Sequence, residues 1–162
     1  MRQIMDERRV KTPDQSKIEM TELVLPNDTN WLNNLLGGKM LHWIDIAGAL
    51  AGSKHSNSKV ATVAIERVEF RRPIRVGDMV ILIAKLVYAG NTSMDIKVDV
   101  FSENLQTGER LKTNKAYLTF VALDEREKPV IVPLLKPETE EEIAEYLMAE
   151  QKRNERIQKK QK

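Results

Sequence analysis

One segment limits the folds available to this chain more than any other. After two glycines at 37 and 38, the run KMLHWIDIAGALAGSKH places apolar side chains at helical spacing around most of its circumference. A helix that is apolar on nearly all sides must be buried on several of them. Gly48 and Gly52 each weaken such a helix by about 1 kcal/mol relative to alanine, so we expect them to permit close packing. The polar residues 56–58 end the helix.

Extended segments follow this helix with no second helix between them. Two of them, 60–70 and 92–103, alternate with period two, and turn residues separate the segments. The expected strands are 60–70, 79–90, 92–103 and 109–125, with one more, 18–26, before the helix. Short turns between the later strands require antiparallel pairing. We therefore expect an α+β fold, with an antiparallel sheet of about five strands around one long central helix.

The composition narrows the classes of function. The chain has 162 residues, enough for one domain, and 26 basic against 24 acidic residues leave a net charge of +2. So small a charge argues against a nucleic-acid partner. The absence of cysteine and the presence of only two histidines exclude disulfides, thiolate ligands and a poly-histidine metal site. No apolar run approaches the ~18–20 residues of a membrane span, so we expect no membrane association and a cytoplasmic location.

Residues 136–162 form a charged tail, which we separate from a core domain over residues 1–135. Thr139 followed by three glutamates is the pattern of a capping box at the start of a helix. Acidic residues then gather at the beginning of the tail and basic residues at its end, as the helix dipole favours. The apolar content is a short stripe at Ile143, Tyr146 and Leu147, with Ile157 isolated. We expect a solvated C-terminal helix that docks weakly.

Asp45 is the charged residue in the middle of the apolar helix. A buried carboxylate without a partner costs several kcal/mol, and carboxylates in such positions often belong to functional sites. The alternatives are an ion pair with a cation such as Arg67, or exposure to solvent beside His42. His42 lies on the same helical face, but no serine in a nucleophile elbow accompanies the pair. We interpret His42 as a packing residue.

Three further features allow a structural or a functional interpretation. The glycines at 37–38 can form a simple turn, or can leave N–H groups at a helix start free for a thioester oxygen or a phosphate. Arg71, Arg72 and Arg75 surround a proline, either as a solvated turn or as a local anion site. The polar run 27–30 before the helix suits turns and caps, or a site.

Six short motifs occur in a fixed order along the core. They are DTN at 28–30, LGGK at 36–39, WID at 43–45, VEFRRPIRVGD at 68–78, VYAGNTSM at 87–94 and AYLTFVALD at 116–124. In this order, and over roughly residues 18–135, they resemble the acyl-CoA hydrolase branch of the hotdog-fold thioesterases. The resemblance implies the hotdog fold, which agrees with the sheet and central helix expected from periodicity, plus the C-terminal helix.

The resemblance also implies hydrolysis of fatty acyl-CoA to a free fatty acid and coenzyme A. Asp45 would act as base or nucleophile, Asn30 from the partner subunit would act with it, and N–H groups near Gly38 would stabilise the oxyanion. The residues implied to lie near the coenzyme A moiety are Gly37, Arg71, Arg75, Gly90, Asn91, Thr92 and Ser93. Because a thioester is already activated, one base, one polariser and an oxyanion site suffice. We expect neither a metal nor an organic cofactor.

The chain departs from the family's pattern in the loop before the helix. Where the family has His-Gly shortly after the asparagine, this sequence has Leu32-Asn33, with Trp31 beside them. Asparagine can reach the left-handed backbone conformation that glycine adopts, so we expect the loop to keep its shape. Trp31 and Leu32 would then alter the acyl pocket.

Three other functions fit the same fold, because fold alone does not determine function. The hydratases and dehydratases of this fold carry a histidine five residues after the helix aspartate, where this chain has Leu50, or a His/Glu pair. A non-catalytic acyl-CoA-binding module would bind coenzyme A without hydrolysis. A structural dimer would have no affinity for coenzyme A.

A second copy of the chain is the expected partner besides the acyl-CoA substrate. One helix cannot cover both faces and both edges of a five-stranded sheet, and open edges invite pairing. We expect a homodimer that joins two sheets edge to edge. The resemblance implies a trimer of such dimers.

Overall fold

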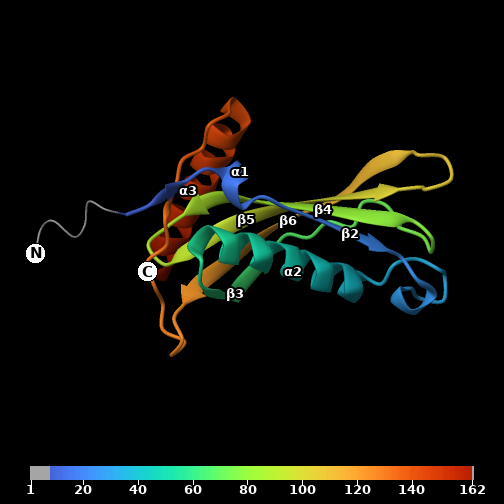
Figure 1. The fold of residues 1–162 in the computed structure, drawn as a ribbon, viewed down its shortest axis with the longest axis horizontal. Coiled ribbons are helices and arrows are strands. Elements are labelled where there is room, and N and C mark those ends of the chain that lie inside the picture. Colours follow the sequence, from blue (N-terminus) through green and yellow to red (C-terminus); the bar gives the residue numbers. More distant parts are fainter. Residues whose placement is uncertain (1–7, 162) are drawn as a thin grey trace, which may run out of the picture.

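The computed structural model describes residues 8–161, and its centre is a five-stranded antiparallel sheet (Figure 1). In spatial order the strands are β2 (Ile18–Leu23), β4 (Met79–Ala89), β5 (Ser93–Glu103), β6 (Arg110–Leu123) and β3 (Lys59–Glu66). Helix α2 (Gly37–Ser56) lies along one face of this sheet. The predicted arrangement of one central helix against about five antiparallel strands is confirmed.

The side chains between α2 and the sheet form the core. Ile44, Ala47 and Ala51 of the helix are fully buried. A β-carbon added at Gly48 would lie 2.9 Å from the ring of Phe120, and one added at Gly52 would lie 3.3 Å from the side chain of Ile96. The prediction that these glycines permit close packing is therefore confirmed.

The ends of the elements follow from local backbone conformation. Asn57 ends α2 at the predicted place, with a left-handed φ of 54° and its N–H donating to the Ser53 carbonyl at 2.7 Å. Strand β3 stops at Glu66, earlier than the expected residue 70, because Arg67 has a φ of 52° and leaves the extended conformation. Four short elements were not anticipated. They are β1 (Val10–Lys11), which pairs in parallel with β7 (Leu134–Leu135), α1 (Pro13–Ser16) and the 3₁₀ turn η2 (Pro26–Asp28).

Helix α3 (Glu140–Lys160) lies on the sheet face opposite α2 (Figure 1). Its predicted capping box is confirmed, since Thr139 Oγ1 accepts from the N–H of Glu142 at 3.0 Å and the Glu142 carboxylate accepts from the N–H of Thr139 at 3.1 Å. Its Tyr146 contacts Tyr88 of β4, with ring centroids 4.9 Å apart. No residue of α3 is buried. None of the described helices has the length and apolar character that a membrane crossing needs.

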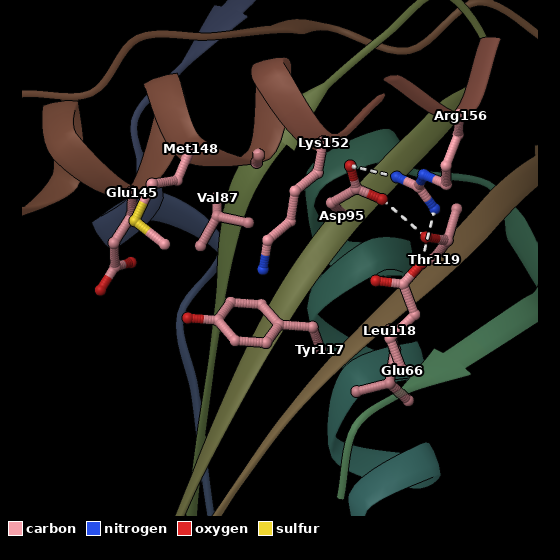
Figure 2. A pocket seen from close by; sticks show the side chains of 11 residues that line it. Glu66, Val87, Asp95, Tyr117, Leu118, Thr119, Glu145, Met148, Lys152 and Arg156 are labelled. Atoms are coloured by element: carbon pink, nitrogen blue, oxygen red, sulfur yellow. Dashed lines mark hydrogen bonds and ion pairs between the residues drawn. The ribbon is translucent and has the colours of Figure 1, made fainter. Parts of the chain in front are cut away.

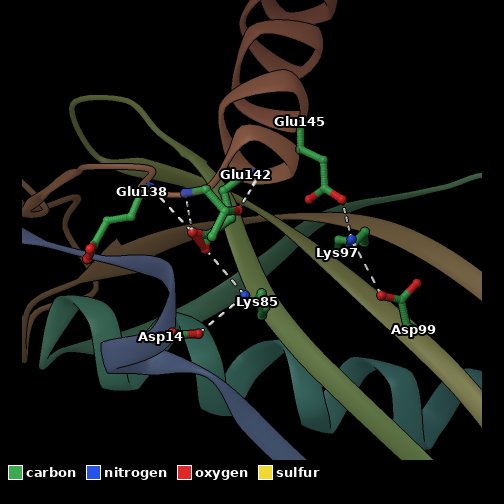
Figure 3. A network of polar contacts seen from close by, with 8 residues as sticks. Asp14, Lys85, Lys97, Asp99, Glu138, Glu142 and Glu145 are labelled. Atoms are coloured by element: carbon green, nitrogen blue, oxygen red, sulfur yellow. Dashed lines mark hydrogen bonds and ion pairs between the residues drawn. The ribbon is translucent and has the colours of Figure 1, made fainter.

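Charged side chains attach the start of α3 to the sheet (Figure 3). Lys97 of β5, which is 7% exposed, lies 3.5 Å from Asp99 and bonds to Glu145 of α3. Burial alone would lower the pKa of Lys97, but the bond to Glu145 and the charges of both carboxylates outweigh it and raise the pKa. Lys85 lies in the same way between Glu142 and the carboxylate of residue 14, at 3.3 Å from each. The helix therefore docks through ion pairs more than through apolar side chains.

His55 is a fully buried histidine near the end of α2. Its Nε2 lies 2.8 Å from the carbonyl oxygen of Pro133, and its Nδ1 has no partner within residues 8–161. Burial lowers the pKa of His55, the bond to Pro133 raises it in part, and the charges of Lys11, Arg8 and Arg9 lower it further. The folded protein therefore keeps the imidazole neutral, with Nε2–H donating to the carbonyl.

We expect this histidine to make the protein less stable in mild acid. The unfolded chain takes up a proton near the ordinary pKa of 6.5, and the folded chain resists it. The stabilisation is complete above that pH and is lost as the pH falls toward the lower folded pKa, by at most about 1.4 kcal/mol per pH unit. Urea unfolding of wild type and His55→Gln from about pH 7 to 5 should show the flatter dependence in the variant. His42→Gln is the matched control, and equal slopes in wild type and His55→Gln would contradict the assignment.

Candidate active site

Asp45 projects from the middle of α2 toward the edge strand β3. Its Oδ1 accepts a hydrogen bond from Thr62 Oγ1 at 2.7 Å, and the residue is half-buried. Within residues 8–161 it forms no ion pair, so the alternative pairing with Arg67 does not occur. A carboxylate that is oriented by one hydroxyl and keeps its second oxygen available can accept a proton from water or attack a carbonyl carbon.

Thr62 is a candidate site residue that the sequence analysis missed. It pairs with Phe120, whose side chain is fully buried on the inner face, so Thr62 also faces α2. The strand register shifts between Thr62 and Ala64, at the exposed edge of the sheet. The sequence feature that could have indicated Thr62 is a polar residue at a position of the strand after the helix where the alternation places side chains toward the helix.

Asn30 lies in the loop between η2 and α2, where its side chain builds a turn. Its Oδ1 accepts from the backbone N–H of Leu32 at 2.9 Å and of Asn34 at 3.2 Å. Asn33 has a φ of 61°, which confirms the expected left-handed conformation. Trp31, at 96% exposed, and Leu32, at 67%, form the tip of this turn. The amide nitrogen of Asn30 has no partner among the described residues and is available as a donor.

The start of α2 offers free N–H groups beside a cavity. The first residues of a helix have no intrahelical acceptors, and a β-carbon at Gly38 would meet nothing within 4 Å. A cavity of about 320 Å³ opens here, lined in part by Gly37, Phe70 and Arg71. Arg71 also pairs with a glutamate two residues earlier, at 3.0 Å. Arg75 does not line this cavity, and its backbone N–H donates to the Asp78 carboxylate at 3.1 Å.

The four residues predicted at 90–93 form the turn between β4 and β5, at the other end of the sheet (Figure 1). Met94, which follows this turn, lies near Gly52 in the last part of α2. A helix of 20 residues is about 30 Å long. One protomer therefore does not bring this turn together with Gly37 and Arg71.

A smaller cavity lies between α3 and the outer face of the sheet (Figure 2). Asp95 lies at its side, with Oδ1 accepting from Thr119 Oγ1 at 2.7 Å and Oδ2 3.7 Å from Arg156. Met148 and Lys152 of α3 also line it. Its volume of about 30 Å³ is that of one water molecule. It is too small for an organic substrate.

Comparison with known proteins agrees with this architecture. Residues 32–109 match the sequence model of the thioesterase superfamily. The acyl-CoA thioester hydrolase YkhA of Bacillus subtilis (strain 168), itself described as uncharacterized, is 41% identical over 146 residues, which cover 90% of this chain and 85% of that protein.

Two solved structures extend the similarity to the whole fold. An acyl-CoA thioesterase superposes with a TM-score of 0.89 at 42% identity, over 93% of this chain and 97% of that one. An acyl-CoA hydrolase from Staphylococcus aureus gives a TM-score of 0.83 at 33% identity, over 94% and 95% of the two chains. With its central helix, antiparallel sheet and C-terminal helix, the chain belongs to the hotdog-fold acyl-CoA thioester hydrolases of the thioesterase superfamily.

Proposed function

We propose that this protein hydrolyses fatty acyl-CoA to the free fatty acid and coenzyme A, with Asp45 as base or nucleophile. The observation that carries the proposal is the Asp45 carboxylate, which Thr62 orients on the helix whose start has free N–H groups. Water adds to the thioester carbon while Asp45 takes its proton, or the carboxylate itself adds and water then hydrolyses the acyl–Asp45 anhydride. The carbonyl oxygen becomes negative, and the N–H of the partner subunit's Gly38 stabilises it, because Gly38 of the same helix lies about 10 Å from Asp45. The C–S bond then breaks and the thiolate of coenzyme A takes up a proton.

A relative supports the choice of residues. The Staphylococcus aureus hydrolase is known in complex with butyryl coenzyme A and coenzyme A. It has also been solved with alanine in place of one asparagine, one aspartate or one threonine. Those positions are separated by 15 and then 17 residues, as are Asn30, Asp45 and Thr62 in this chain. The same residue types at the same separations support a shared catalytic role.

A homodimer would join the two halves of the proposed site. Strand β3 is an open edge of the sheet, with Val63 at 60% and Ile65 at 40% exposed. If two β3 strands pair antiparallel about a two-fold axis, the start of one α2 comes to lie beside the other protomer's β4–β5 turn. The coenzyme A moiety then contacts Gly37 and Arg71 of one chain and the 90–93 turn of the other, with Asn30 supplied by the partner subunit. The hexameric state of a solved relative supports a trimer of such dimers.

Thiol release from acyl-CoAs of graded chain length tests the proposal. We expect stoichiometric release of coenzyme A and fatty acid, unchanged by EDTA because no step needs a metal. We also expect a sharp upper limit in chain length, since Trp31 and Leu32 accompany Asn30 into the site. Coenzyme A binding without thiol release from any substrate would instead identify a binding module. If the protein has no affinity for coenzyme A, the remaining alternative is a structural dimer without a ligand.

A further inference from the structure

Arg153, near the middle of α3, contacts the turn between β4 and β5. Its guanidinium donates to Ser93 Oγ, and its Nη1 lies 3.9 Å from Oδ2 of Asp95. Its central carbon lies 5.0 Å from the centre of the Tyr88 ring. A planar guanidinium that is stacked on a ring and bonded at its edge has a fixed position and orientation. This side chain therefore connects α3 to the turn.

Gly90 in this turn is small for a spatial reason. The glycines with a positive φ are Gly77 and Gly108, so the backbone conformation at Gly90 does not require a glycine. A β-carbon at position 90 would lie 2.7 Å from the guanidinium carbon of Arg153. Side-chain atoms do not approach so closely without displacing their neighbour. The guanidinium thus occupies the space in which a side chain at residue 90 would lie.

The hydrogen bonds of the 90–93 turn occupy its carbonyl oxygens and leave two of its backbone N–H groups free within the described part of the chain. The carbonyl oxygens of Gly90 and Asn91 accept from the side chain of Arg8, and that of Thr92 accepts from the N–H of Ala122 at 2.9 Å. Within residues 8–161, no hydrogen bond uses the N–H of Asn91 or Thr92. Unpaired backbone N–H groups with guanidinium groups behind them form a surface that suits an anion.

We propose that α3 is a positioning element of the substrate site, in which Arg153 holds the 90–93 turn so that its free N–H groups bind a phosphate of acyl-CoA. The inference rests on the proposed function, because it takes acyl-CoA as the substrate. Arg153 acts through the turn, since Ser93, Asp95 and Tyr88 already engage its guanidinium. The charge of Asp95 does not repel the phosphate strongly, because Arg153 itself pairs with this carboxylate at 3.9 Å.

The test compares two thioesters of the same acyl group, one of coenzyme A and one of N-acetylcysteamine. Both have the same reacting atoms, and the second has no phosphate. In Arg153→Ala, KM for acyl-CoA should rise about tenfold more than KM for the N-acetylcysteamine thioester, which is the loss expected for one charge-assisted contact. Gly90→Ala should give the same selective rise, because its methyl group displaces the guanidinium.

Arg156→Ala is the matched control, since it removes an arginine that binds α3 to Glu66 and Asp95 without touching the turn. Its KM for acyl-CoA should stay within about twofold of wild type. An equal rise for both thioesters in Arg153→Ala, or the same selective rise in Arg156→Ala, would overturn the inference. If wild type hydrolyses neither thioester, the proposed function fails. Calorimetric binding of coenzyme A, expected to be about tenfold weaker in Arg153→Ala than in Arg156→Ala, then tests the inference alone.

Discussion

Asp45→Asn should lower kcat for acyl-CoA hydrolysis by about 10³-fold, the scale of a lost general base or nucleophile. Asparagine has the same shape and its carbonyl oxygen can still accept from Thr62, so the helix and its packing should be preserved. What is lost is the negative charge that accepts a proton or attacks the thioester. Thiol release under saturating substrate measures the effect.

Thr62→Val should lower kcat less than Asp45→Asn does, because it leaves the carboxylate in place. It removes only the hydroxyl that donates to the Asp45 carboxylate at 2.7 Å, and a hydrogen bond to a charged group contributes about 1.5–3 kcal/mol. We therefore expect a loss of about tenfold to 100-fold in kcat, smaller than that of Asp45→Asn. Sedimentation and circular dichroism should match wild type in both variants. If Asp45→Asn kept more than about a tenth of the wild-type rate, the catalytic assignment would be wrong.

Val63→Lys should abolish both the dimer and the activity. Val63 lies at 60% exposed on the open edge strand β3, and a lysine there blocks pairing with a second sheet edge. Because the proposed site takes Asp45 from one chain and Asn30 from the other, the monomer should be at least about 100-fold less active. Sedimentation at micromolar concentration and thiol release on the same sample measure the two effects.

Leu105→Lys is the matched control, since Leu105 is 55% exposed in the β5–β6 hairpin and away from β3. It should leave the dimer intact. A fully active monomer of Val63→Lys would refute the shared site. An intact dimer of the same variant would place the interface elsewhere than β3.

The parts of the fold that depend on local pattern were predictable from the sequence. The apolar periodicity of α2 and the polar residues after it fixed both helix ends, because burial and capping act over a few residues. Strand β3 was predicted too long because alternation continues past Glu66, while the positive φ of Arg67 is set by the tertiary structure. The position of α3 also required the structure. Alternation along β5 predicts only that one of its faces is polar, whereas α3 binds Asp95 and Lys97 of that face in ion pairs.

The sequence indicated which residues could belong to the candidate site, but not how they are arranged in space. A lone aspartate in an apolar helix and a glycine pair at its start indicated Asp45 and Gly38, because each violates the pattern around it. Thr62 was missed because threonine is common in strands, and only the strand register places it opposite the helix carboxylate. Gly37 and the 90–93 turn lie at opposite ends of one protomer, so the cooperation that we propose for them in a dimer could not be deduced from the pattern of one chain.

The close approach of Arg153 to Gly90 has a consequence for how this sequence can diverge. Positions 90 and 153 are distant in sequence yet share one volume, since a β-carbon at 90 would lie 2.7 Å from the guanidinium carbon. A side chain at 90 displaces the guanidinium and so removes its contacts with the turn, a loss that no longer arises once the arginine has been replaced by something shorter. The effects of substitutions at the two positions should therefore not be additive, because a side chain at residue 90 costs less in a chain that has already lost the arginine.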